Sequence, residues 1–233
     1  LSEWKEKNKD GLSRPVLITG ARGVGKTYLS FDFGKSFYQD IIYINFERNG
    51  RLKRLFYEEQ PEIILDKISD HFHKPLNKDT ILILDEIGYC EEGIQFILQV
   101  KEHKLPVNII GITSKPLDYI SLREELEGCV EHMALYPFDF EEYLWATGYE
   151  WYSDVIREHF AKNKKIPDIV HNELLNIFEQ YMNVGGFPRV INEYMNTEMF
   201  INISEQQNSI LESFYADAGN KDDSLYVKIK SIL

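Results

Sequence analysis

A run of eight residues near the start of the chain has the types and spacing of a phosphate-binding loop. It reads Gly20-Ala21-Arg22-Gly23-Val24-Gly25-Lys26-Thr27 and fits the pattern G-x-x-x-x-G-K-[ST]. The glycines let successive backbone N–H groups converge on an anion at the positive end of a helix. We therefore expect Lys26 to reach the β- and γ-phosphates of a nucleotide, and the Thr27 hydroxyl to ligate Mg²⁺.

A second stretch supplies two adjacent carboxylates. The apolar residues Ile81-Leu82-Ile83-Leu84 are followed directly by Asp85 and Glu86. Many strands end in acids at a surface, so this pattern alone is a weak signal. After a phosphate-binding loop it becomes a strong one, and it predicts that Asp85 holds Mg²⁺ while Glu86 polarises an attacking water.

Alternating strand and helix patterns are expected to position these residues. Continuous apolar runs are typical of parallel strands that are covered on both faces. Helical patterns at residues 52–72, 91–104 and 122–126 separate the later strands. The five predicted strands are Val16–Thr19, Ile41–Phe46, Thr80–Glu86, Val107–Ile112 and Cys129–Tyr136. We predict an α/β fold, a P-loop NTPase three-layer sandwich with a five-stranded, mostly parallel sheet.

After Pro137 the predicted elements are all helical. Helical patterns cover residues 138–145, 151–160 and 171–182, and a glycine turn at Gly185-Gly186 leads into a helix that starts at Pro188. These segments predict a small all-helical lid subdomain. The expected division is therefore an ATPase core at 1–136, a lid at 137–199, and the start of a truncated second domain at 200–233.

Composition limits the classes of partner. With 26 Lys and Arg against 38 Asp and Glu, the net charge is −12. This argues against a broad nucleic-acid-binding face, although it leaves a local basic patch open. Two cysteines cannot form a disulfide framework, which favours a reducing cytoplasm. No apolar run approaches the ~20 residues of a membrane span, and no signal peptide is recognisable.

Four motifs together resemble AAA-type P-loop ATPases. More narrowly, the chain resembles an uncharacterised bacterial and archaeal family in which an AAA-like ATPase domain precedes a domain of unknown function. The third motif is the least generic, because P-loop proteins at large lack it. The motifs are Leu17–Thr27, Ile83–Glu86, Leu135–Tyr143 and Gly185–Pro188.

The resemblance implies ATP and Mg²⁺ as cofactors. It places a sensor hydroxyl for the γ-phosphate or the water at Thr113-Ser114, although an ordinary cap on a strand end fits these residues equally well. It also implies that Gly186-Phe187-Pro188 belongs to a lid. The start of the helix at Pro188 and Arg189 then either faces the nucleotide or is an ordinary turn between helices. Trp4 is either a packing anchor or a wall of the adenine pocket. The expected nucleotide-binding residues are Gly20, Arg22, Gly23, Val24, Gly25, Lys26, Thr27, Tyr28 and Pro188.

One departure from the family pattern bears on turnover. Relatives often carry Gly-Arg just before the fifth strand, where this chain has Gly128-Cys129. If that arginine acts as a finger, Arg123 or Arg189 must replace it here, or hydrolysis is slow.

The leading hypothesis is an ATPase whose hydrolysis changes the state of an unknown protein partner or of its own C-terminal region, with homo-oligomerisation left open. The alternative is a nucleotide-gated switch with little turnover. The chain also formally matches two GTPase motifs, D-x-x-G at Asp85–Gly88 and N-K-x-D at Asn220–Asp223. The second match has no strand before it to place it beside the phosphate-binding loop, so we treat both matches as coincidence. A small-molecule kinase fits the acid pair and the Gly-Gly-Phe-Pro turn less well.

Overall fold

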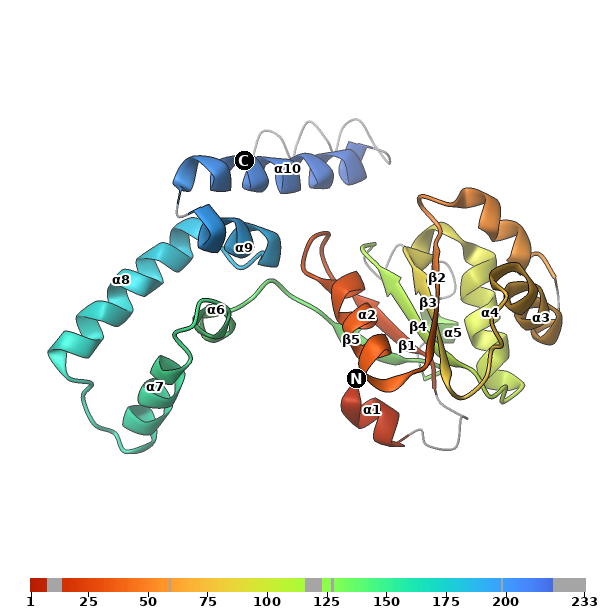
Figure 1. The fold of residues 1–233 in the computed structure, drawn as a ribbon, viewed down its shortest axis with the longest axis horizontal. Helices are drawn as coiled ribbons and strands as arrows, with labels where there is room; N and C mark the ends of the chain where they lie inside the picture. Colours follow the sequence, from red (N-terminus) through yellow and green to blue (C-terminus); the bar gives the residue numbers. More distant parts are fainter. Residues whose placement is uncertain (8–13, 59, 116–122, 127, 198, 220–233) are drawn as a thin grey trace. The chain divides into compact units, whose positions relative to one another are not determined.

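The computed structural model divides into two compact units (Figure 1). It describes residues 1–7, 14–58, 60–115, 123–126, 128–197 and 199–219. The first unit consists of Leu1–Ala21 and Gly25–Leu135, and the second of Arg22–Val24 and Tyr136–Leu233. The predicted three-part division at 136 and 199 stays a prediction.

A five-stranded parallel sheet forms the centre of the first unit. Its strands are β1 (Val16–Thr19), β2 (Asp40–Asn45), β3 (Thr80–Asp85), β4 (Asn108–Thr113) and β5 (Glu131–Ala134). They lie in the order β2-β3-β4-β1-β5, and every pairing is parallel. The predicted α/β sandwich with a parallel sheet is therefore confirmed.

The apolar residues of each strand serve two cores because successive side chains point to opposite faces of a sheet. Leu82 and Leu84 belong to one buried cluster, and their neighbours Ile81 and Ile83 belong to another. Every residue of β3 and β4 is buried, as a central strand covered on both faces requires.

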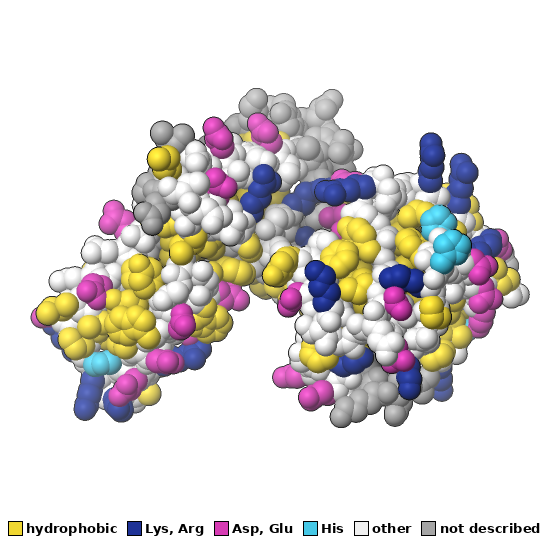
Figure 2. All heavy atoms as spheres, in the orientation of Figure 1, with side chains coloured by type: hydrophobic (Ala, Val, Ile, Leu, Met, Phe, Trp, Pro, Cys, Tyr) yellow, Lys and Arg dark blue, Asp and Glu magenta, His cyan; other side chains and the backbone are white. Residues whose placement is uncertain are grey.

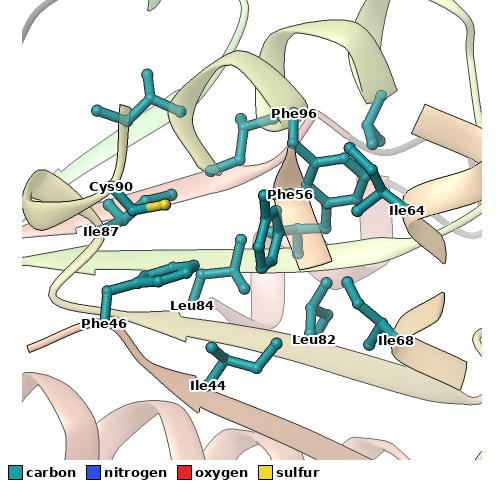
Figure 3. Packing of buried hydrophobic residues seen from close by; sticks show 14 of the residues in the cluster. Ile44, Phe46, Phe56, Ile64, Ile68, Leu82, Leu84, Ile87, Cys90 and Phe96 are labelled. Atoms are coloured by element: carbon teal, nitrogen blue, oxygen red, sulfur yellow. The ribbon is translucent and has the colours of Figure 1, made fainter. Parts of the chain in front are cut away.

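Helices cover both faces of this sheet. On one face lie η1 (Gly50–Phe56), α3 (Pro61–Phe72) and α4 (Glu91–Glu102), whose Phe56, Ile64 and Phe96 pack on the strands (Figure 3). On the other lie α1 (Ser2–Lys7) and α2 (Lys26–Phe37), which contribute Trp4 and Phe33. Two short elements, η2 (Ile87–Tyr89) and α5 (Arg123–Leu126), complete the unit. The sheet and its two helical layers form the sandwich.

In the first unit, the structure corrects one predicted helix and favours one of the two interpretations of Trp4. The single helix predicted at 52–72 is wrong: a 3₁₀ helix ends at Phe56, and α3 starts separately at Pro61. Proline lacks the N–H that a continuing helix needs, so it stands at the first position of a new one. Trp4 is fully buried, and its Nε1 donates to the Arg14 carbonyl oxygen at 2.7 Å, which makes it a packing anchor.

All regular secondary structure in the described part of the second unit is helical. Its helices are α6 (Phe140–Ala146), α7 (Trp151–Ala161), α8 (Asp168–Val184), α9 (Pro188–Thr197) and α10 (Phe200–Gly219). Their core includes Tyr143, Leu174, Ile177 and Val190, with Ile203 from α10. Helix α6 begins with a capping box in which the Asp139 side chain accepts from the Glu142 N–H and the Glu142 side chain accepts from the Asp139 N–H.

The two motifs of the second unit that carried the family resemblance contact each other. The Phe138 N–H donates to the Gly186 carbonyl oxygen at 2.7 Å, and the Tyr181 hydroxyl donates to the Phe138 carbonyl oxygen at 3.0 Å. A Cβ at Gly186 would lie 2.1 Å from that same Phe138 oxygen. The close backbone approach explains why glycine stands in the turn between α8 and α9.

No helix in the described part of the chain has the length and apolar character to cross a bilayer.

Candidate functional site

The register of the sheet brings several polar side chains to one edge. In the parallel pairing, Asn45 on β2 lies opposite Asp85 on β3, and Thr19 on β1 lies opposite Thr113 on β4. Each of these residues ends its strand. Because all strands run in the same direction, their carboxyl ends form a single edge, which is where open α/β sheets bind ligands. The glycine-rich loop leaves β1 at this edge.

Lys26 begins α2 directly after the loop. Gly25 has φ +100°, a left-handed conformation that glycine adopts at little cost, and it caps the helix. The Lys26 ammonium donates to the carbonyl oxygens of Gly20 and Ala21, both at 2.8 Å, and the residue is 5% exposed. The first two residues of the loop therefore hold its lysine at the N-terminus of α2.

Thr27 and Asp85 are joined although 58 positions separate them in the sequence. The Thr27 hydroxyl donates to Asp85 Oδ2 at 3.2 Å. A hydroxyl and a carboxylate at this separation present the hard oxygen atoms that Mg²⁺ prefers. The structure thus brings together the two residues that the sequence singled out as metal ligands.

Two further side chains hold Asp85, and the sequence reasoning missed both. The Tyr43 hydroxyl donates to Asp85 Oδ2 at 2.6 Å, and the Asn45 amide donates to the same oxygen at 3.1 Å. The second oxygen, Oδ1, accepts from the Glu86 N–H at 3.0 Å. Burial, and then the hydrogen bond to Asp85, raise the pKa of Tyr43 to about 12, so its hydroxyl remains a donor at neutral pH.

The orientation of Asn45 is fixed from its other side. Its Oδ1 accepts from the backbone N–H of Arg48 at 2.7 Å, so its amide nitrogen faces Asp85. Asn45 is the only strongly polar side chain in the apolar run Ile41–Phe46. That exception was the feature of the sequence that could have marked Asn45 as a site residue. The acid two positions later, Glu47, lies beyond the strand and is exposed.

Glu86 has an unusual backbone and a specific partner. Its φ of 53° and ψ of 44° are left-handed, a conformation that costs a residue with a Cβ about 1–2 kcal/mol. Its Oε2 accepts from the Ser114 hydroxyl at 2.8 Å and from the Ser114 N–H at 3.1 Å. Such local strain is found at functional sites, where surrounding contacts maintain it.

Of the two candidate sensor residues, Ser114 contacts Glu86 through its side chain. Thr113 is fully buried, and its Oγ1 accepts from the Lys115 N–H at 3.1 Å. The Lys115 ammonium donates to the Gly88 carbonyl oxygen at 2.8 Å. A Cβ on Gly88 would lie 2.8 Å from Thr113 Oγ1, so the segment after Glu86 packs tightly against the end of β4.

The remaining expected residues lie elsewhere in the chain. Tyr28, on the first turn of α2, is 77% exposed. Arg22, Gly23 and Val24 belong to the second unit, as do Pro188 and Arg189 at the start of α9. The formal N-K-x-D match at 220–223 falls outside the described residues.

The donor set of the first unit fits a magnesium nucleotide. The loop offers a lysine beside a helix N-terminus, as polyphosphate binding requires. Mg²⁺ is usually held by one or two carboxylates together with substrate phosphates, which matches the Thr27 and Asp85 pair. Within the described residues, no three His, Cys, Asp or Glu side chains gather as a separate metal site.

The sheet order, the loop on β1 and the paired acids after β3 define a P-loop NTPase fold. A family model described as an AAA domain matches residues 12–144, and the chain therefore belongs to this AAA family. The AAA-type resemblance of the sequence is thereby confirmed.

Individual proteins are also similar to this chain over most of its length. Uncharacterized protein MJ1544 of Methanocaldococcus jannaschii is 27% identical over 175 residues, which cover 75% of this chain and 35% of that protein. The chain thus spans about a third of the length of this relative. Among solved structures, PCH-2 of C. elegans is 13% identical with a TM-score of 0.46, covering 90% of this chain and 62% of that one. The RuvB Holliday junction branch migration motor of Thermotoga maritima is 12% identical with a TM-score of 0.48, covering 100% and 66%.

Proposed function

We propose that this protein binds ATP with Mg²⁺ and hydrolyses it, and that hydrolysis changes the conformation presented to a partner. The observation that carries this proposal is the convergence of Lys26, Thr27, Asp85 and Glu86 on one edge of the sheet. Two of these residues follow the loop on β1 and two end or follow β3, and the hydrogen bond between Thr27 and Asp85 joins the two pairs.

Each residue has a separate role in the proposed reaction. Lys26 would donate to the phosphate oxygens, Thr27 would ligate the metal, and Asp85 would hold the metal through water or Thr27. Glu86 orients the attacking water and accepts its proton, while Ser114 keeps the Glu86 carboxylate in place. Bound MgATP supplies the phosphoanhydride bond that is cleaved and the charge that offsets the phosphates.

The test compares nucleotide binding with turnover. We expect ATP to bind more tightly than GTP to the wild type in the presence of Mg²⁺. Lys26→Ala should lose binding by at least tenfold, whereas Glu86→Gln should retain binding and lose phosphate release by about 10²-fold or more. Lys35→Ala and Glu91→Gln are matched controls, because both residues are exposed, lie in helices and are not among the proposed site residues. Unchanged turnover in Glu86→Gln would exclude Glu86 as the base.

A nucleotide-gated switch with little turnover is the second candidate. It is favoured by Cys129, which stands at the position where relatives often carry arginine. In that case the wild type binds ATP, releases no phosphate above background, and regains turnover only when a partner delivers an arginine. The proposed partners are a separate protein, a C-terminal region of the same protein, or further copies of the chain.

A further inference from the structure

A local concentration of positive charge stands out in this acidic protein. The ten residues from Arg48 to Tyr57 contain Arg48, Arg51, Lys53 and Arg54 and no Asp or Glu, although the whole chain carries −12. The segment follows β2 at the carboxyl edge of the sheet and includes the 3₁₀ helix η1. Basic side chains project from the corner of the first unit (Figure 2) where Figure 1 draws this segment in orange.

The 3₁₀ conformation sorts these residues onto distinct faces. Side chains at positions i and i+3 of a 3₁₀ helix eclipse one another. Leu52 and Leu55 share one face and pack against the core, and Phe56 is buried at 2% exposure. Arg51 and Arg54 share the outward face, about 6 Å apart along the helix axis. The apolar contacts therefore anchor the helix to the core while its two arginines face solvent.

An exposed aromatic side chain continues the outward face. Tyr57 is the C-cap of η1 at φ −80° and ψ 3°, close to helical values, and it stands three residues after Arg54. Its side chain is 62% exposed. Two guanidinium groups and a phenol thus follow one another on a single ridge, which we call the Arg51–Arg54–Tyr57 ridge.

The arginines of this segment form no ion pair with any residue that the structure describes. Lys53 differs from them, because its ammonium donates to the Tyr89 carbonyl oxygen and lies turned toward the protein. The nearest acid that follows the ridge, Glu58, pairs with Lys67. The guanidinium groups of the ridge are therefore available to an external anion.

We propose that the Arg51–Arg54–Tyr57 ridge binds single-stranded nucleic acid. Arginine forks bind phosphate oxygens in a bidentate manner, and an exposed aromatic ring stacks on any base, so this combination tracks a strand without reading its sequence. An acidic polypeptide would satisfy the arginines but leaves the tyrosine without a flat partner. This activity goes beyond nucleotide hydrolysis and does not depend on it.

Binding of a fluorescent oligothymidylate of about 20 nucleotides, measured by anisotropy without ATP, tests the proposal. The wild type should bind at low salt and weaken as salt rises. The double variant Arg51→Gln, Arg54→Gln should weaken binding at least tenfold. The slope of log binding constant against log salt concentration should also become less negative by about 1.4, which is 0.7 for each lost phosphate contact. Tyr57→Leu should weaken binding roughly tenfold through lost stacking, with little change in slope.

Two matched substitutions serve as controls. Lys78→Gln removes an exposed cation of the same unit before β3, at the opposite edge of the sheet, and Tyr136→Leu removes a tyrosine that is 73% exposed. Neither should change affinity by more than about twofold. Absence of wild-type binding at low salt, or an unchanged slope in the double variant, overturns the proposal. So does displacement of the oligonucleotide by polyglutamate at equal charge, which would assign the ridge to an acidic protein. ATP affinity of the same variants separates this result from any failure of the nucleotide site.

Discussion

The hydroxyl of Ser114 donates a hydrogen bond of 2.8 Å to Oε2 of Glu86, and the Ser114 N–H donates to the same oxygen at 3.1 Å. The residue that follows β4 thus orients the carboxylate that follows β3. Since β3 and β4 are adjacent in the sheet, this contact needs no flexible loop to form. Rigid support of this kind is what a positioned general base requires.

Replacing Ser114 with alanine should therefore lower turnover without weakening nucleotide binding. The variant loses the hydroxyl contact but keeps the backbone one, so we expect kcat to fall about tenfold with little change in ATP affinity. Ser114→Thr retains a hydroxyl and should recover most of the activity. Ser36→Ala, at an exposed position of helix α2, is the control. Equal turnover in Ser114→Ala and the wild type would show that the contact has no role in catalysis.

Removal of the Tyr43 hydroxyl should change the response to magnesium. Tyr43→Phe deletes the 2.6 Å hydrogen bond to Asp85 Oδ2 while keeping the ring, which packs 4.9 Å from Phe31. We expect the Mg²⁺ concentration for half-maximal turnover to rise about tenfold, because partners of metal ligands tune metal affinity by roughly that factor. A titration of phosphate release with Mg²⁺ measures it, and Tyr136→Phe, at a tyrosine that is 73% exposed, is the control. A general loss of kcat at saturating Mg²⁺ would instead indicate a structural defect.

Substitution of Gly186 with alanine should destabilise the second unit. The new Cβ would lie 2.1 Å from the Phe138 oxygen, and backbone atoms on both sides would have to move. We expect a loss of about 1–3 kcal/mol in the free energy of unfolding. Tryptophan fluorescence in urea can follow it, because Trp145 and Trp151 both lie in that unit. Gly50→Ala, whose Cβ would meet no atom within 4 Å, should unfold like the wild type.

Lys53 links the helix that carries the ridge to the segment that follows Glu86. Its ammonium donates to the Tyr89 carbonyl oxygen in η2, three residues after Glu86. If both proposals hold, oligonucleotide should stimulate phosphate release severalfold in the wild type, and Lys53→Met should bind the oligonucleotide within about twofold but lose the stimulation. Lys78→Met is the control. Normal stimulation in Lys53→Met would mean that the signal does not pass through this contact.

The sequence was sufficient for the elements that carry strong local patterns. Continuous apolar runs located β1 to β4, and the loop and the acid pair pointed to the carboxyl edge of the sheet as the candidate site. The split between η1 and α3 was predictable in principle from Pro61, but apolar spacing across 52–72 continued through it. Periodicity alone does not distinguish one helix from two that pack on the same core.

The contacts of Asp85 required the three-dimensional pairing. Tyr43 and Asn45 come about 40 positions before it, and only the register between β2 and β3 sets them beside it. The sequence also could not show which of the two candidate sensor residues, Thr113 or Ser114, contacts Glu86 through its side chain. Every residue of β4 is buried, so no alternation of polar and apolar residues marks which hydroxyl faces Glu86.

The left-handed backbone of Glu86 separates folding stability from activity at a single position. Glycine or asparagine adopts this conformation more readily, so a chain selected only for thermal resistance would carry one of them there. Glu86→Gly is accordingly expected to melt at a higher temperature than Glu86→Ala, although both lack the carboxylate. A glutamate at this position implies that the protein tolerates a less stable fold in exchange for the group it presents.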